Sequence, residues 1–322
     1  MSIELEIFKE KLSEEWDNFV EHSDNGTIFN TRKFLNYHEK GKFTDASLIF
    51  RNKGKIYALM PAVIREVSGE KILFSHPGAS YGGLVFSETN DLKKMVEVVK
   101  TVDKHAKKIG CDRIILTQTP IYYYGHYNSY VDFALHTSGF NYKVRELSSV
   151  LSLEHSEEEI FNTFPENVKR AIRKAEKSGV IIKKSKNTAD FYKILKNNLE
   201  MRHDVRPTHT LKELKQLVSI FPDKIELFAA YLEDKMIGGV ITFTCNRRVV
   251  LAFYIAHDHS FQKYRPVDLI IWSLIQELTE RNVKFLDFGT FTLRMEPNWG
   301  LCRFKEKFGA RGVFRDTFER RI

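Results

Sequence analysis

The chain contains the same order of elements twice, and this repeat limits its fold most strongly. The segments IFRNKGKIYALMPAVI and AAYLEDKMIGGVITFT each read as two apolar runs around a short turn, the pattern of a β-hairpin. A helical pattern and then a short apolar strand follow each hairpin, CDRIILTQTP in the first half and VKFLDFGTFT in the second. We therefore predict a duplicated α+β fold, in which each copy is a mixed sheet flanked by helices. Chance similarity is the alternative, because unrelated α+β domains share such orders.

The length fits this duplication, since 322 residues are enough for two domains of ordinary size. We place the boundary near Leu153, with an N-terminal domain at 1–153 and a C-terminal domain at 154–322. With 43% hydrophobic residues, each half can build a core, which excludes disorder as the main state.

Composition also sets expectations about the compartment. The sequence has no apolar run of about 18 residues, so we expect no membrane span, while peripheral contact with a membrane stays open. The first residues, MSIELEIFKEKLSEEW, lack the basic start and apolar stretch of a signal peptide. The 3 cysteines are far apart and fit a reducing environment. Together these features predict a cytoplasmic protein.

Capping signals predict individual helices. Ser156 with Glu159 forms a capping box, and Asn167–Lys177 is an amphipathic helix that ends before Gly179. A further helix is predicted from Thr31 to about Lys40, ended by Gly41.

The net charge of +8 lies mostly in the second half of the chain. Residues 167–187 carry 8 bases and 1 acid, and residues 301–315 carry 5 bases and 1 acid. Such runs are typical either of solvated faces or of contact with a polyanion.

Several motifs are missing. The sequence contains no GxGxxG after a strand, no P-loop, no CxxC, no HExxH and no GxSxG. Dinucleotide chemistry, nucleotide hydrolysis, zinc catalysis and α/β-hydrolase chemistry therefore lack their usual residues, and we expect no metal site.

Two segments resemble the FemABX family, the aminoacyl-transferases that build peptidoglycan cross-bridges. ENVKRAIRKAEKSGV resembles the basic helix that opens the family's second domain, and FLDFGTF…NWGLCRFKEKFGA resembles its C-terminal block. HPGASYGGLVF and DVRPTHTLKEL are similar to blocks of the broader FemAB-like acetyltransferase group. The resemblance implies tandem GNAT (acyl-CoA N-acyltransferase-like) domains, in agreement with the repeat.

The resemblance implies transfer of an aminoacyl group from aminoacyl-tRNA, or of another acyl group, to an amine of a peptidoglycan or amino-sugar precursor. The donor is then a co-substrate, no resident cofactor is needed, and no DNA contact is expected. Two alternatives stay open: CoA-dependent N-acetylation of an amino-sugar or peptide, and a non-catalytic protein that binds RNA or a nucleotide-sugar on the same fold.

The family places a Phe-Lys pair at the reaction centre, which implies Phe304 and Lys305 here. Transfer to an amine passes through a tetrahedral oxyanion, so Lys305 is a candidate clamp for that charge or for a carboxyl group, and Phe304 a wall that excludes water. Arg303, beside the pair, is a candidate substrate-binding residue. We expect Lys305→Met to leave the fold intact but remove most of the transfer rate, and Lys307 to be dispensable.

The end of the apolar strand FLDFG supplies two more candidates. Asp287 is a candidate for holding the attacking amine. The alternative is that its carboxylate only stabilises a turn at the end of the strand. Gly289 would let a substrate approach the backbone closely.

Four substrate-binding candidates lie elsewhere. Arg173 and Lys174, on the basic helix, fit an RNA backbone or the diphosphate of a nucleotide-sugar. His209 could lie over the site, although Thr210 is at least as well explained as the cap of the next helix. Tyr81 is assigned to the acceptor cleft.

The segment HDHSFQKYRPVDLII bears on the donor. Acetyl-CoA enzymes of the resembled fold bind the CoA diphosphate on a glycine-rich loop that opens a helix. Here no glycine lies between His257 and Ile271. This favours a donor other than CoA.

Overall fold

A computed structural model describes residues 3–89, 91–203 and 206–322. The chain divides into two compact units, Met1–Leu147 with Phe314–Ile322, and Ser148–Val313. The boundary expected near Leu153 is thus replaced by one at Leu147, and the last residues, which we had assigned to the second domain, belong to the first unit. The reason is strand pairing: β17 (Arg311–Arg321) pairs through its final residues with β8 (Arg113–Thr117) of the first unit.

The second unit is built on a mixed sheet in the order β10-β11-β12-β13-β14-β9. Neighbouring strands are antiparallel except β13 and β14, which are parallel. The strands are β10 (Val180–Ser185), β11 (Ile225–Leu232), β12 (Lys235–Thr244), β13 (Val249–His257), β14 (Phe285–Thr290) and β9 (Asn141–Ser152).

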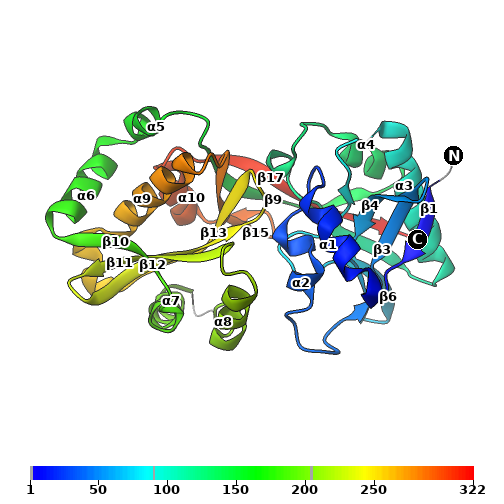
Figure 1. The fold of residues 1–322 in the computed structure, drawn as a ribbon, viewed down its shortest axis with the longest axis horizontal. Coiled ribbons are helices and arrows are strands. Elements are labelled where there is room, and N and C mark those ends of the chain that lie inside the picture. The colour runs from blue at the N-terminus through cyan, green and yellow to red at the C-terminus, as the bar shows by residue number, and fades with distance from the viewer. Residues whose placement is uncertain (1–2, 90, 204–205) are drawn as a thin grey trace. The chain divides into compact units, whose positions relative to one another are not determined.

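Helices cover both faces of this sheet (Figure 1). On one face α9 packs against α6 and the strands, and on the other face lie α7 and α8. The helices of this unit are α5 (Glu157–Thr163), α6 (Glu166–Lys177), α7 (Thr188–His203), α8 (Leu211–Ile220), α9 (Pro266–Glu280) and α10 (Trp299–Glu306). The predicted capping box of Ser156 and Glu159 opens α5, and α6 buries Val168, Ala171, Ile172 and Ala175 as its amphipathic pattern requires.

The first unit holds a four-stranded sheet, β1-β3-β4-β7, and the strands β17, β8, β6, β5 and β2. Its elements are β1 (Glu4–Ile7), α1 (Ser13–Glu21), α2 (Arg32–Leu35), β2 (Thr44–Asp45), β3 (Leu48–Asn52), β4 (Lys55–Met60), β5 (Val63–Val67), β6 (Glu70–Ser75), β7 (Val85–Phe86), α3 (Leu92–Lys108) and α4 (Tyr130–Thr137). Short 3₁₀ turns connect several of these elements.

The predicted repeat is confirmed in the order of elements. In the first unit the hairpin β3–β4 is followed, after β5, by β6, the short strand β7, α3 and β8. In the second unit the hairpin β11–β12 is followed by β13, α9 and β14. Each unit has one parallel pair whose connection contains the helix, β6 with β8 through α3 and β13 with β14 through α9. A parallel pair joined through a helix is the element that both units share.

The helix predicted from Thr31 to Lys40 is much shorter, because α2 ends at Leu35. The chain leaves the helix where side chains find partners elsewhere in the fold. His38 places its Nε2 2.9 Å from the carbonyl oxygen of Gly78. Local pattern could not predict this tertiary contact.

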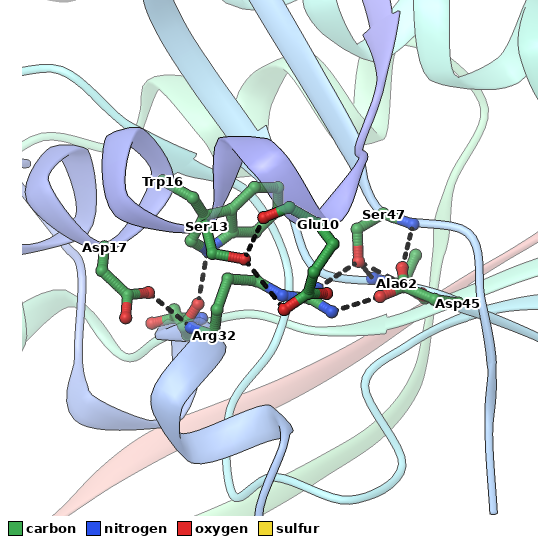
Figure 2. Close-up of polar contacts among 9 residues, drawn as sticks. Glu10, Ser13, Trp16, Asp17, Arg32, Asp45, Ser47 and Ala62 are labelled. Carbon is green, nitrogen blue, oxygen red and sulfur yellow. Dashed lines mark hydrogen bonds and ion pairs between the residues drawn. The ribbon is translucent and has the colours of Figure 1, made fainter. Parts of the chain in front are cut away.

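A buried arginine ties the N-terminal elements of the first unit together (Figure 2). The guanidinium of Arg32 donates to the carboxylate of Asp45 and to Oγ of Ser47, and it lies 3.9 Å from the ring centre of Phe8. The backbone N–H of Arg32 donates to Asp17. This charge is therefore buried with partners, as a buried charge must be.

The core of the second unit extends to the segment after α10, where Phe308 is fully buried. Its ring lies 5.8 Å from Phe164, 6.1 Å from Phe288 and 5.6 Å from Phe304.

We predict that Phe308→Ala lowers the free energy of unfolding by about 3–5 kcal/mol, because it leaves a cavity among three aromatic rings. Ile181→Ala is the control, since Ile181 is 61% exposed in the same unit and should change the free energy by about 0.5 kcal/mol or less. Urea denaturation measures both variants. Equal effects would contradict the assigned core.

Candidate active site

The two parallel strands of the second unit part after a short pairing. β13 pairs with β14 only from Val249 opposite Phe285 to Leu251 opposite Asp287, although β13 continues to His257. Among the described residues, no strand pairs with this edge of β13 beyond Leu251. The backbone groups that follow are thus left without a strand partner, as needed to receive an extended ligand.

β14 ends at this parting with an irregular turn. Its register with β9 shifts between Asp287 and Thr290, which marks a bulge. Gly289 there has a φ of +72°, a left-handed conformation that favours glycine. An added Cβ would meet only Leu251 Cδ1, at 3.9 Å, so the backbone conformation, and not close packing, is what requires glycine.

Asp287 is fully buried at the end of β14. Its Oδ1 accepts hydrogen bonds from the backbone N–H of Gly289 at 2.7 Å and from Oγ of Ser148 at 3.1 Å. Its neighbours Leu286 and Phe288 belong to the core around α9, so the alternation of the strand puts Asp287 on the other face of the sheet. Asp287 therefore serves the strand-end turn and also brings a carboxylate to the parting.

Lys305 reaches the same turn from α10, where its side chain is held in the interior. The residue is only 4% exposed, and its Nζ donates to the carbonyl oxygens of Gly289 and Thr290, both at 2.7 Å. Burial lowers the pKa of Lys305 to about 8, while electrostatic interactions with Asp287 and then with Cys302 oppose this shift. Lys305 is therefore no solvated surface lysine.

The ammonium of Lys305 can donate one more hydrogen bond than the two that the carbonyl groups accept. With a pKa of about 8, it is mainly protonated at pH 7. An ammonium has three N–H donors, and the two carbonyl groups take two of them.

These contacts revise two expectations about the C-terminal block. Removal of the Lys305 ammonium would leave two carbonyl groups without their donor, so Lys305→Met also costs stability. Lys307 is not simply dispensable, because its Nζ lies 2.5 Å from Oδ1 of Asp268 and forms an ion pair with it.

The other residues of α10 divide between core and surface. Phe304 is half-buried and packs edge-on against Phe308. Arg303 is exposed. Of this block, the structure brings Lys305 together with Asp287 and Gly289, and it places Phe304 against the core beside them.

His209 lies beneath the parted strand and is 95% buried. Its Nδ1 lies 2.9 Å from the hydroxyl of Tyr254, and its backbone N–H donates to the same hydroxyl at 3.1 Å. Burial raises the pKa of Tyr254 to about 12, so the phenol stays protonated at neutral pH. Thr210 caps α8 in a capping box with Glu213, as the alternative predicted.

Tyr254 is a further candidate residue, which the sequence analysis did not identify. It lies in β13 beyond the parting, after a register shift against β12 that separates it from Ala252. Its next neighbour, Ile255, packs against the core around α9. Tyr254 therefore faces the same side as Asp287, the side that α7 covers. Tyr254 was not singled out from the sequence because it lies in a continuous apolar strand sequence, where a tyrosine is expected as a core residue.

The remaining candidates are on α6 of the second unit and in the first unit. Arg173 and Lys174 are on the exposed face of α6, and the Arg173 guanidinium is 3.5 Å from the carboxylate of Glu166. Tyr81 belongs to the first unit, where its ring is buried 5.1 Å from Tyr123 and 5.8 Å from Phe29. The side chain of Tyr81 is thus part of that unit's core.

Two features are absent from the residues that the structure describes. No three His, Cys, Asp or Glu side chains are grouped to hold a metal ion. No helix in that part of the chain has both the length and the hydropathy to cross a membrane.

Comparison with known proteins identifies a domain family in the second unit and solved structures with the same fold. Residues 163–306 match the family described as "Acetyltransferase (GNAT) domain". No curated protein matches the chain. The crystal structure of FemX superposes with a TM-score of 0.76 at 13% identity, covering 99% of this chain and 97% of FemX.

Two further solved structures share the fold. A tandem GNAT protein from the clavulanic acid biosynthesis pathway has a TM-score of 0.57 at 10% identity, with 99% of this chain and 98% of that one covered. The C-terminal domain of a putative lysylphosphatidylglycerol synthetase from Agrobacterium fabrum has a TM-score of 0.59 at 10% identity, with 96% and 91% covered. The chain therefore has the fold of FemX and of a tandem GNAT protein, and residues 163–306 of its second unit match the acetyltransferase (GNAT) domain family.

Proposed function

We propose that this acyltransferase moves an aminoacyl group from aminoacyl-tRNA to an amine of a cell-envelope precursor, a peptidoglycan or amino-sugar compound, in the cytoplasm. The observation that carries the proposal is the buried, mainly protonated ammonium of Lys305, held where β13 and β14 part.

The reaction needs few groups from the protein. The uncharged amine attacks the ester carbonyl of the donor, a C–N bond forms, and the ester C–O bond breaks. The proton lost by the amine goes to the departing hydroxyl of the donor. The carbonyl oxygen becomes negative in between, and a fixed positive group beside it lowers the barrier. We assign this role to Lys305, and the holding of the amine to the carboxylate of Asp287.

The segment between β13 and α9 supports a donor other than CoA. It forms a 3₁₀ helix, His259–Tyr264, instead of a glycine-rich loop. Arg265 precedes α9 in a left-handed conformation, and Pro266, the first residue of α9, has no N–H to offer a phosphate. The exposed bases of α6 supply charge for an RNA backbone or for the diphosphate of a nucleotide-sugar acceptor.

The comparisons support two candidate donors, the solved structures an aminoacyl donor and the family match an acyl-CoA donor. The fold occurs in FemX and in a domain named for a lysylphosphatidylglycerol synthetase, a name that describes an aminoacylated product. The match of residues 163–306 to an acetyltransferase family favours the second candidate, CoA-dependent N-acetylation of an amino-sugar or peptide.

The function is tested by incubating the protein with aminoacyl-tRNA or with acyl-CoA, together with envelope precursors. Mass spectrometry then detects the precursor that has gained an aminoacyl or acyl group. Product from aminoacyl-tRNA supports the proposal, product from acyl-CoA alone supports the second candidate, and product from neither indicates a non-catalytic binding protein.

We predict that Lys305→Met lowers the transfer rate about 10²–10³-fold, because the charge beside the oxyanion is lost. The variant should also lose about 1–3 kcal/mol of stability, because two buried carbonyl groups lose their donor. Initial rates are measured well below the melting temperature of each variant, so that the two effects separate.

Lys215→Met is the matched control, since Lys215 is an exposed lysine on α8. It should keep the full rate. A folded Lys305→Met protein with more than about a third of the activity would show that the reaction centre is elsewhere.

We predict a pH dependence that Asp287 controls. If protonated Lys305 is required, activity falls as the pH rises through about 8. The negative charge of Asp287 raises the pKa of Lys305, so Asp287→Asn lowers that pKa and moves the fall in activity to lower pH. The profile of kcat/KM against pH shows the shift, and Asp223→Asn, at an exposed aspartate, should leave it in place. If the fall in activity at high pH does not move in Asp287→Asn, the titration of Lys305 does not cause it.

We predict that replacing both Arg173 and Lys174 by Gln weakens tRNA binding and makes it less sensitive to salt. Each lost phosphate contact reduces the slope of log K against log salt by about 0.7–0.9. Fluorescence titration between low and moderate salt measures this slope. The same exchange at Lys212 and Lys215 on α8 is the control, and equal slopes in all proteins would remove α6 from the tRNA site.

A further inference from the structure

The start of α9 already holds an anion from the protein itself. A helix N-terminus carries a partial positive charge and free N–H groups, which makes it a natural place for a phosphate. Here the first turn of α9 contains Asp268, whose side chain is only 9% exposed. The carboxylate thus supplies the negative charge that the helix end favours.

The partner of this carboxylate comes from the end of α10. Nζ of Lys307 lies 2.5 Å from Oδ1 of Asp268, and the Lys307 side chain is 27% exposed. The same ammonium lies 5.0 Å from the ring centre of Phe304 and 4.7 Å from that of Phe308. The ammonium of Lys307 therefore already interacts with one carboxylate and two aromatic rings of the protein, and this is the charge that a ligand would need.

The pair closes the helix end to phosphate in two ways. The Asp268 charge repels an incoming anion, and it also neutralises the nearby ammonium that would otherwise attract one. Pro266 removes a donor from the same turn.

We propose that the Asp268–Lys307 ion pair takes the place of a bound phosphate at the start of α9 and so selects against acyl donors with a diphosphate there, coenzyme A thioesters above all. Asp268 is then a specificity-determining residue. The inference rests on the proposed function, because it explains why this acyltransferase uses a donor whose phosphates bind elsewhere.

The test is the binding of coenzyme A and of inorganic pyrophosphate to the full chain, measured by isothermal titration calorimetry. Asp268→Asn keeps the shape of the side chain, removes its charge and frees Lys307. It should bind both probes at least about tenfold more tightly than the unchanged protein, a change of about 1.4 kcal/mol. Asp268→Ser makes the same change of charge and should behave alike if Asp268→Asn does not fold.

Two control proteins locate the effect. Asp268→Asn combined with Lys307→Gln should lose most of the gain, since the freed ammonium is gone. Asp223→Asn, at an exposed aspartate of the same unit, should bind like the unchanged protein.

Three results would overturn the inference. They are a folded Asp268 variant that binds the probes no more tightly, a gain for coenzyme A without one for pyrophosphate, and an unchanged protein that binds coenzyme A as tightly as the variant. The first two leave the proposed function intact. Acyl transfer from acyl-CoA by the unchanged protein would instead contradict the proposed donor itself.

Discussion

A lysine ammonium can be buried only where acceptors surround it, and in this chain that requirement shapes the end of β14. The turn at Gly289 directs two successive carbonyl oxygens toward α10, and Lys305 binds both of them. The left-handed backbone of Gly289 and the hydrogen bond from its N–H to Asp287 keep that turn in place. One buried charge thus joins α10, the end of β14 and the parting of the parallel strands.

The surrounding structure makes this arrangement rigid. Phe308 follows α10 and packs among Phe164, Phe288 and Phe304, while Asp268 binds Lys307 from the start of α9. Both contacts hold α10 against the core on one side of Lys305. On the other side, the strands stop pairing and leave backbone groups for a ligand. The proposed acyl transfer would use the charge of Lys305, because its transition state gains negative charge at one oxygen.

The pattern of the sequence predicted much of the fold, because hairpin, helix and buried strand each leave a local signal. The order of elements, the capping box of α5, Thr210 as the cap of α8 and the amphipathic face of α6 followed from it. The early end of α2 did not, since His38 leaves the helix for a partner 40 positions away, Gly78. The boundary between the units was also not predicted, because the pairing of β17 with β8 joins residues 200 positions apart, such as Thr117 and Thr317.

The candidate site divides in the same way. The family resemblance pointed to Lys305, Asp287 and Gly289, which the structure brings together, but spacing alone could not have paired residues from a strand and a later helix. Tyr254 was missed because one phenol in an apolar strand carries no signal until its partner His209 is seen.

The protonation of Lys305 is the central claim, and nuclear magnetic resonance titration of its side-chain nitrogen measures it directly. The account predicts a pKa near 8, with the resonance assigned by its loss in Lys305→Met. An ordinary lysine value of about 10.4 would contradict the buried, carbonyl-bound ammonium on which the site depends.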